Sequence, residues 1–183
     1  MTDTKYKNSK GEWTYFQNVL DDFELEKVNR YLKDDHWGFG YTSSDPDKPI
    51  WNFNRDKGRT IAETIASKLN GYKLITWNIN GQTMGQQGAW HNDLNAYDLD
   101  NKIIPCTHAF IFFFQEWNYE WGGRLHIKVD ERDKLWQQET IVVTPQKNSG
   151  ILFDADRQHY AEAPTEPYLF RMSVGLKLIH EDS

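Results

Sequence analysis

Two histidines and one aspartate form a pattern in this sequence that could bind a metal ion. His91 and Asp93 are two positions apart, and His159 stands far downstream. Two imidazoles and one carboxylate are the ligand set of a facial-triad non-haem iron(II) site. Because successive side chains of a β-strand point to opposite faces, His91 and Asp93 would share one face of a strand. The spacing therefore predicts a metal centre that His159 completes from a distant strand.

A second candidate binding group follows at Arg171 and Ser173. Arg171 stands within an apolar run, where an inward-facing guanidinium requires a counter-charge. Ser173, again two positions away, can add a hydroxyl on the same face. The counter-charge is either an Asp or Glu of the protein or the carboxylate of a ligand, which Arg can bind through two parallel hydrogen bonds. A metal triad beside a carboxylate clamp indicates an iron enzyme that activates oxygen with 2-oxoglutarate.

The sequence blocks around these residues resemble, in their order, those of the Fe(II)/2-oxoglutarate-dependent oxygenases, and most closely the prolyl 4-hydroxylase branch. The resemblance covers about residues 72–178. His-x-Asp alone is a weak signal, because it occurs by chance in many proteins, whereas the ordered set of five blocks is strong. The blocks are Gly85–Trp90 before the first histidine, Ala109–Phe114, Trp121–Ile127, Gly150–Asp154 before the second histidine, and Arg171 with Ser173.

The resemblance implies a role for each of these residues. His91, Asp93 and His159 would hold Fe(II), while Arg171 and Ser173 would bind the distal carboxylate of 2-oxoglutarate. The reaction would consume O2, release succinate and CO2, and hydroxylate a C–H bond, with ascorbate as a further candidate cofactor. Asp93 favours hydroxylation, because the related halogenases typically lack this carboxylate. The substrate would be a peptide, a protein or a small molecule, and peptidyl proline is one candidate.

The sequence departs from the prolyl hydroxylase pattern at the other cosubstrate contacts. Several relatives carry a tyrosine hydroxyl in the strand equivalent to Thr107–Phe114, where this chain has phenylalanines. Thr107 is the candidate replacement for that hydroxyl, and Ser173 is the alternative. A second tyrosine, often found before the iron pair, is also missing, and polar residues stand near its place. These are Asn78, Asn80, Gln82 and Gln86.

Three further residues are candidates for contacts with the substrate: Trp90, Arg124 and Trp51. Trp90 immediately precedes the first histidine and would otherwise belong to the core. Arg124 follows a Gly-Gly turn and would otherwise lie on a solvated face. Trp51 is an aromatic residue in a loop-rich stretch. The segments Tyr41–Arg55 and Asn95–Cys106 are the candidates for a mobile lid over the site.

The elements that must position these residues predict a mainly β fold with flanking helices (α+β). Eight short strands separated by turns suit a jelly roll or another β-barrel. The family resemblance selects the double-stranded β-helix, the cupin-like jelly roll, with two N-terminal helices packed outside. The predicted strands are Tyr72–Asn80, Trp90–Asp93, Thr107–Phe114, Leu125–Val129, Thr140–Val143, Gly150–Phe153, His159–Ala161 and Tyr168–Leu178. An earlier strand is predicted over Trp13–Leu20, and helices from Asp21 or Asp22 to Leu32 and from Thr60 to Leu69.

Length and composition predict one dioxygenase domain over residues 1–183. Residues 1–10 would fray, 11–71 would support the core, and 72–178 would form the jelly roll. Cys106 is the one cysteine, which excludes an intramolecular disulfide. No apolar run approaches the ~20 residues that span a membrane. The N-terminus lacks the apolar core of a signal peptide, so we expect a cytoplasmic protein.

Two other functions compete with the oxygenase interpretation. A cupin-like jelly roll without oxygenase activity would bind metal, but it would not need the clamp at Arg171 and Ser173. A nucleic-acid demethylase of the same superfamily would need a basic face toward the phosphate backbone. The net charge of −6 and the lack of a basic stripe argue against that partner.

Overall fold

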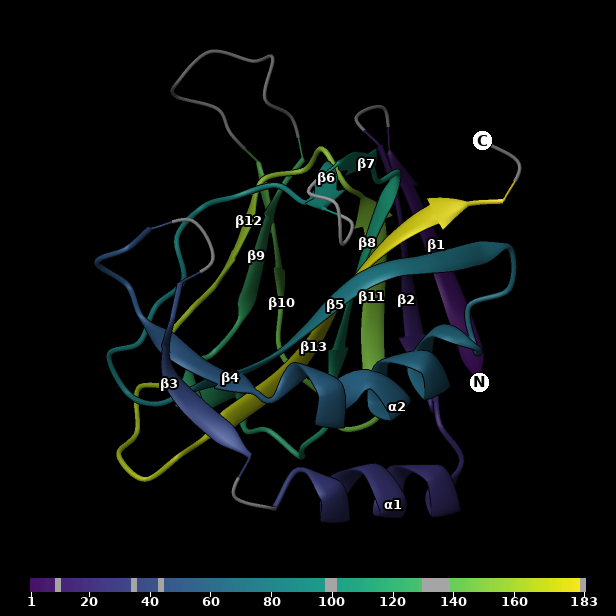
Figure 1. Ribbon diagram of the computed structural model, residues 1–183. Coiled ribbons are helices and arrows are strands. Elements are labelled where there is room, and N and C mark those ends of the chain that lie inside the picture. Colours follow the sequence, from purple (N-terminus) through teal and green to yellow (C-terminus); the bar gives the residue numbers. More distant parts are fainter. Residues whose placement is uncertain (9–10, 34–35, 43–44, 98–101, 130–138, 182–183) are drawn as a thin grey trace.

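The computed structural model describes residues 1–8, 11–33, 36–42, 45–97, 102–129 and 139–181 (Figure 1). An eight-stranded sheet has the order β1-β2-β11-β8-β13-β5-β4-β3, a three-stranded sheet the order β10-β9-β12, and β6-β7 form a hairpin. The strands are β1 (Thr2–Asn8), β2 (Gly11–Gln17), β3 (Trp37–Tyr41), β4 (Ile50–Phe53), β5 (Tyr72–Gln82), β6 (Asn95–Tyr97), β7 (Ile103–Pro105), β8 (His108–Phe113), β9 (Leu125–Lys128), β10 (Thr140–Val143), β11 (Ser149–Asp154), β12 (His159–Ala161) and β13 (Arg171–His180). The helices are α1 (Asp22–Tyr31), α2 (Arg55–Ala66) and the 3-10 helix η1 (Tyr119–Trp121).

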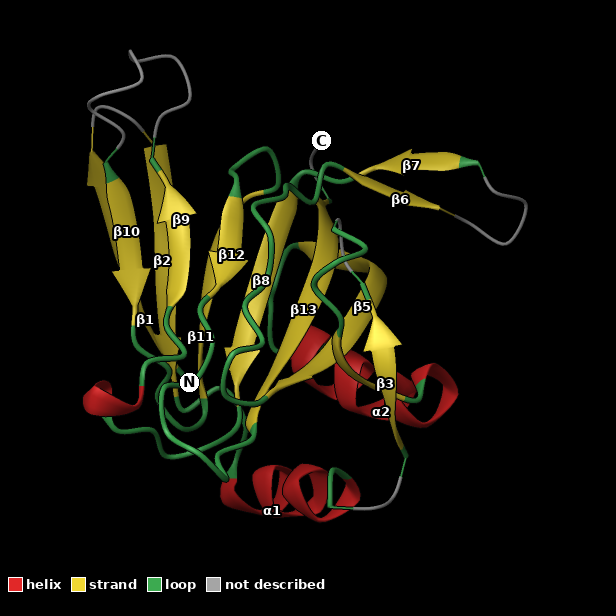
Figure 2. Cartoon of the chain, turned by 90° about the vertical axis from the view of Figure 1, so that its left-hand side faces the viewer, coloured by secondary structure: helices red, strands yellow, loops and turns green. Residues whose placement is uncertain are grey.

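Strand β8 is buried on both of its faces. Phe110 and Phe112 belong to the hydrophobic cluster that includes residues of α1 and α2. Ile111 and Phe113 belong to a second cluster, shared with strand β9 of the small sheet. The two helices lie on one side of the large sheet and strands β9, β10 and β12 on the other (Figures 1 and 2). This arrangement explains the continuous apolar run of β8, and it confirms the mainly β class with two flanking helices.

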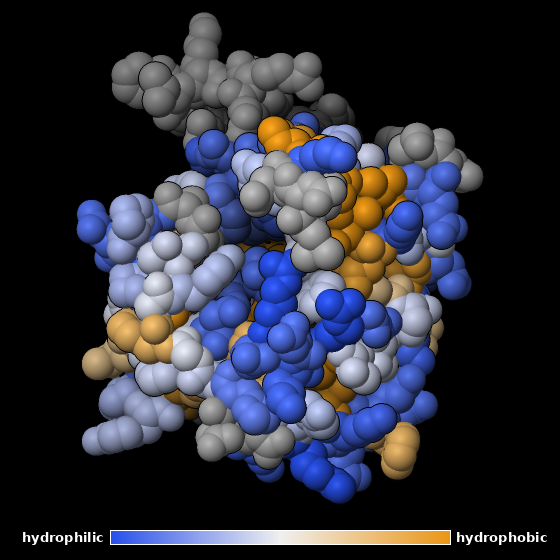
Figure 3. All heavy atoms as spheres, in the orientation of Figure 1, coloured by the Kyte–Doolittle hydropathy of each residue, from blue (hydrophilic) through white to orange (hydrophobic). Residues whose placement is uncertain are grey.

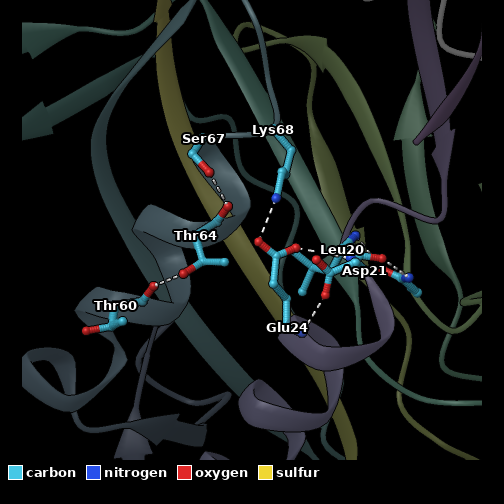
Figure 4. A network of polar contacts seen from close by, with 8 residues as sticks. Leu20, Asp21, Glu24, Thr60, Thr64, Ser67 and Lys68 are labelled. Atoms are coloured by element: carbon cyan, nitrogen blue, oxygen red, sulfur yellow. Dashed lines mark hydrogen bonds and ion pairs between the residues drawn. The ribbon is translucent and has the colours of Figure 1, made fainter.

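Helix α1 begins where the sequence predicted it, because Asp21 and Glu24 form a capping box. The Asp21 carboxylate accepts a hydrogen bond from the Glu24 backbone N–H at 2.8 Å, and the Glu24 carboxylate accepts one from the Asp21 N–H at 3.0 Å. Glu24 also pairs with Lys68, whose Nζ lies 2.6 Å from its Oε1 (Figure 4). The capping residue therefore ties α1 to the segment that follows α2.

Helix α2 begins at Arg55, earlier than the predicted Thr60. Asn54 caps it and accepts a hydrogen bond from the Lys57 backbone N–H at 3.1 Å. The first turn is polar, so the apolar periodicity that marks the helix in the sequence starts only at Ile61. Among the described residues, no helix is long and apolar enough to cross a membrane.

Strand β13 lies between β5 and β8 and carries one column of side chains toward the space between the two sheets. This column is Arg171, Ser173, Gly175 and Lys177, at every second position. Arg171 stands opposite Gln82 of β5, because the two strands pair in antiparallel register. Two basic residues, Arg171 and Lys177, thus stand at opposite ends of this column.

The structure differs from the sequence-based expectation at two segments. Thr2–Asn8, expected to fray, forms β1 and pairs with β2 along its whole length. Its polar side chains carry no apolar period, and backbone pairing does not require one. The predicted strand over Trp90–Asp93 is absent, and this segment contributes an isolated bridge from His91 to His159.

The two predicted lid segments contain strands. The segment from Tyr41 to Arg55 includes β4, and Asn95–Cys106 includes the hairpin strands β6 and β7. Residues 98–101 of the second segment lie outside the described part of the chain. Closure of either segment over the site stays a prediction.

Candidate metal centre and adjoining cavity

His91, Asp93 and His159 meet at one point, with one ligand atom of each within 4.8 Å of the others. Backbone hydrogen bonds hold them there, although the first two do not stand on a regular strand. His91 and His159 exchange a pair of bonds, at 3.1 Å and 2.8 Å, and the Asp93 N–H donates to the Ala155 carbonyl at 2.8 Å. The predicted convergence is therefore present, on an irregular segment fixed to β12 and to the turn before it.

Both histidines hold the tautomer that a metal site requires. The Nδ1 of His91 lies 2.9 Å from the Ala89 carbonyl, and the Nδ1 of His159 lies 3.0 Å from the Arg157 carbonyl. A carbonyl only accepts, so each Nδ1 carries a proton, and in the neutral ring Nε2 is then the nitrogen that presents a lone pair. Burial lowers the pKa of His159 to about 4, against the opposing effect of Asp93, so this imidazole is neutral at pH 7. Metal binding needs that neutral form.

Asp93 is 7% exposed and ionised. Burial acts to raise its pKa, but His159, Lys177 and His91, in that order, outweigh burial and lower it. Its two oxygens have different neighbours. Oδ2 lies 3.6 Å from the Nε2 of His159, and Oδ1 lies 3.1 Å from the Nζ of Lys177. The centre thus offers two imidazole nitrogens and one carboxylate oxygen, which suits a divalent metal of the iron type.

Arg171 is 1% exposed and incompletely partnered. Its Nε donates to the Gly123 carbonyl at 2.6 Å, and its Nη1 donates to Gln82 Oε1 at 2.9 Å and to Ser173 Oγ at 3.1 Å. Its Nη2 is buried and has no hydrogen-bond partner among the described residues. Burial lowers the pKa of Arg171 to about 10, so the group remains charged at pH 7.

The counter-charge expected for Arg171 is not supplied by the protein. No ion pair joins it to a carboxylate in the described part of the chain. Glu162 acts on it only at longer range, since its carboxylate is engaged by Arg124 at 2.7 Å. The ion-pair alternative for Arg171 is therefore unsupported, and Nη2 is left as a donor that an anion could accept from.

The metal centre and Arg171 line one cavity of about 410 Å³ between the two sheets. In the orientation of Figure 1, the molecular surface is hollowed between the small sheet and β5, with hydrophilic residues around much of the rim (Figure 3). Polar side chains of β5 form one wall, and apolar residues of β8 and β9 close the bottom. The lining is Tyr41, Ile50, Asn78, Asn80, Gln82, Gly88, Trp90, His91, Asn92, Asp93, Ile111, Leu125, His159, Ala161, Arg171, Ser173, Gly175 and Lys177.

Of the other residues predicted to belong to the site, one lines the cavity and three do not. Trp90 lines the cavity and is 40% exposed. Thr107 does not line it: this residue immediately precedes β8, and its hydroxyl accepts from the His180 backbone N–H at 2.8 Å. The assignment of Thr107 to cosubstrate binding therefore has no geometric support.

Arg124 and Trp51 do not line the cavity either. Arg124 lies outside it and forms a two-bond pair with Glu162, at 2.7 Å and 2.9 Å. Trp51 packs its ring against Phe39 and Phe170, with centroids 5.2 Å and 6.3 Å away. Both side chains have protein partners, and the structure does not bring either of them to the cavity that holds the triad.

Two residues of the site were not assigned by the sequence. Gln82 stood among polar residues near a missing tyrosine, and the structure shows that it holds Arg171. Lys177 contacts Asp93, and its signal was available: it continues the alternating series Arg171, Ser173 along the same strand. The alternation of a strand predicts which side Lys177 faces, but it cannot predict that Asp93 arrives from a distant loop.

Comparison with known proteins gives structural matches only. No family model and no curated protein match the sequence. An oxidoreductase of the 2OG-Fe(II) oxygenase family from Burkholderia pseudomallei matches with a TM-score of 0.62 and 11% identity, over 92% of this chain and 88% of that one. A prolyl hydroxylase from Trichoplax adhaerens, in complex with a fragment of the hypoxia inducible factor oxygen degradation domain, matches with a TM-score of 0.63 and 14% identity, over 96% and 86%. SnoN, a non-haem α-ketoglutarate-dependent epimerase of nogalamycin biosynthesis, matches with a TM-score of 0.62 and 12% identity, over 93% and 79%.

At these identities the matches show the fold. The chain has the jelly-roll architecture of the 2-oxoglutarate- and Fe(II)-dependent oxygenases, and its structural neighbours include prolyl hydroxylases. The predicted double-stranded β-helix is thereby confirmed. A hydroxylase and an epimerase share this fold, so the fold by itself selects no substrate.

Proposed function

We propose that this protein is an Fe(II)- and 2-oxoglutarate-dependent dioxygenase that hydroxylates a C–H bond and releases succinate and CO2. The observation that carries the proposal is the buried, unpartnered Nη2 of Arg171 in the cavity that also holds His91, Asp93 and His159. A buried charge without its counter-charge destabilises a protein. A dicarboxylate such as 2-oxoglutarate would bind Arg171 through one carboxylate and the metal through the other, since both line the same cavity.

The triad would hold the metal through side chains whose orientation is already set. His91 and His159 present Nε2 because their Nδ1 atoms donate to backbone carbonyls. Asp93 supplies the negative charge that partly balances a divalent ion. Bound Fe(II), together with 2-oxoglutarate, would supply the oxidising chemistry, while the protein supplies orientation and electrostatics.

Arg171 and Ser173 would bind the distal carboxylate of the cosubstrate. Because Ser173 Oγ accepts a hydrogen bond from Arg171, its own proton is available to the ligand. Gln82 and the Gly123 carbonyl fix the guanidinium so that Nη2 is the remaining donor. Burial strengthens the resulting ion pair, since the dielectric constant inside the protein is lower than that of water.

We further propose that Trp90 contacts the substrate at the cavity rim, and that peptidyl proline is the first substrate class to test. The Trp90 ring is 40% exposed and is braced by Tyr160 at a centroid distance of 4.4 Å. A rigid exposed ring offers a flat apolar surface to a small ring such as proline. A free amino acid or another small molecule is the alternative substrate, and a screen of both classes with the active protein separates them.

The first experiment needs no substrate. Purified protein is loaded with Fe(II) without oxygen and titrated with 2-oxoglutarate, and a visible metal-to-ligand charge-transfer band is sought. Oxygen is then admitted, and succinate is measured with and without ascorbate. We expect a band and slow uncoupled succinate formation, both absent in His91→Ala. Metal binding without any 2-oxoglutarate band would contradict the proposal and favour a metal-binding jelly roll without oxygenase activity.

A further inference from the structure

Each of the three candidate metal ligands is held by a second contact, and one of these contacts differs in kind. His91 and His159 are oriented by backbone carbonyls. Asp93 is oriented by a side chain, because Lys177 Nζ lies 3.1 Å from its Oδ1. A backbone carbonyl cannot be removed by substituting a side chain, whereas the ammonium of Lys177 can. The contact at Asp93 is therefore the one whose contribution can be measured directly.

We propose that Lys177 is a positioning residue that determines which oxygen of Asp93 faces the metal. This inference rests on the function proposed above. A carboxylate can bind a metal through one oxygen or through both. Lys177 occupies Oδ1, and Oδ2 remains turned toward His159 at 3.6 Å. With Asp93 restricted to one oxygen, the facial triad keeps the open positions that 2-oxoglutarate and oxygen require.

The position of Lys177 on β13 and its contacts hold its ammonium beside Asp93. It stands on the same face of β13 as Arg171 and Ser173, with Gly175 between, so the centre of the column carries no side chain. Its ammonium also donates to the Asn95 carbonyl at 2.9 Å, at the start of β6. With two partners and a side chain only 21% exposed, the ammonium is fixed beside Asp93.

A purely structural role for Lys177 makes a different prediction. As a mere counter-ion, it would stabilise the folded protein by neutralising a buried carboxylate. Its loss would then lower stability, without separating the affinity for the metal from the affinity for 2-oxoglutarate. As a positioning residue, its loss lets Asp93 turn both oxygens to the metal. Metal binding then survives, while the position for 2-oxoglutarate is obstructed.

The test compares two neutral variants, Lys177→Met and Lys177→Leu, with Lys177→Arg and wild type. Lys73→Met is the matched control, since Lys73 is an exposed lysine on the neighbouring strand β5. Thermal unfolding verifies the fold of each protein, and the second neutral variant keeps the test intact if the first does not fold. Mn(II) affinity is measured by calorimetry, and 2-oxoglutarate affinity from the charge-transfer band of the anaerobic Fe(II) protein.

Loss of an outer-shell partner typically costs about tenfold or more at a metal site. We expect the neutral variants still to bind Mn(II) and to show this loss in their 2-oxoglutarate affinity. Lys177→Arg, which keeps the cation and its donors, should restore most of that affinity, and Lys73→Met should match wild type. Unchanged 2-oxoglutarate affinity in a folded neutral variant overturns the inference, as does loss of metal binding with the fold intact. Wild type that binds no metal overturns the proposed function itself, a result distinct from both.

Discussion

Arg171 and Arg124 show how the same residue type serves two regions of this molecule differently. Arg171 lies in the cavity between the sheets, 1% exposed, with one nitrogen unpartnered among the described residues. Arg124 lies outside the cavity, and its guanidinium binds both oxygens of Glu162. Hydrogen bonding to Glu162 raises the pKa of Arg124, while burial lowers the pKa of Arg171 to about 10.

The two arginines differ in whether the protein itself supplies the counter-charge. The protein pairs Arg124 with a carboxylate of its own, so a new anion would have to compete with an existing ion pair. Arg171 is held in place by neutral groups, Gln82, Ser173 and a carbonyl, which orient it without neutralising it. Burial combined with incomplete pairing, rather than residue type, distinguishes Arg171 from Arg124.

The largest expected effect is from removing the unpaired charge. Arg171→Met should weaken 2-oxoglutarate binding by about 3 kcal/mol, because it deletes a charge-assisted contact in a buried site. That corresponds to roughly a hundredfold in Kd. Mn(II) affinity should stay near that of wild type, since the triad does not touch Arg171. Calorimetric titrations of both ligands measure the two effects, and loss of Mn(II) binding would show that the two ends of the cavity are not independent.

A smaller effect is expected at the group that orients Arg171. Gln82→Leu removes the acceptor at 2.9 Å from Nη1 but leaves the charge in place. The guanidinium can then rotate away from the productive position, and we expect about a tenfold loss of 2-oxoglutarate affinity, near 1.4 kcal/mol. The charge-transfer titration measures it. A loss as large as that of Arg171→Met would mean that Gln82 contacts the cosubstrate itself.

The contrast between the two arginines also explains what the sequence could predict. Arg171 was recognisable because a charge inside an apolar run needs a partner, and the triad because His91, Asp93 and His159 stand in a known order. Arg124 was a candidate substrate contact only because it follows a Gly-Gly turn, and its partner Glu162 cannot be inferred from spacing along the chain. Pairing between distant residues is decided by strand register, which the sequence does not reveal.

The fold was predictable where side chains alternate in polarity or are apolar throughout, as in β8 and β13. It was not predictable for β1, which is polar and is defined by its backbone pairing with β2. Thr107 was chosen to supply a hydroxyl that relatives provide from another position. In the structure Thr107 immediately precedes β8, and its hydroxyl is bonded to the backbone of His180. The residue type alone does not predict how far along a strand a side chain lies.

For the ion pair of Arg124 and Glu162, we expect small effects that are confined to stability. Arg124→Met should leave 2-oxoglutarate affinity unchanged within error, because its side chain does not line the cavity. It should lower the free energy of unfolding by no more than about 1 kcal/mol, as for other partly exposed pairs. Urea unfolding at pH 7 and the charge-transfer titration check the two statements. A clear loss of cosubstrate affinity would break the distinction between the two regions.

The smallest expected effect is the pH dependence of the pair itself. Hydrogen bonding from Arg124 lowers the pKa of Glu162 from its ordinary 4.5 to about 2. A carboxyl whose pKa is lower in the folded than in the unfolded state stabilises the protein above the unfolded pKa. That contribution is lost as the pH falls toward the folded pKa. The stability difference between wild type and Arg124→Met should therefore be constant above about pH 4.5 and shrink between pH 4.5 and 2. A stability difference that changes above pH 4.5 instead would contradict the assignment of this pH dependence to Glu162.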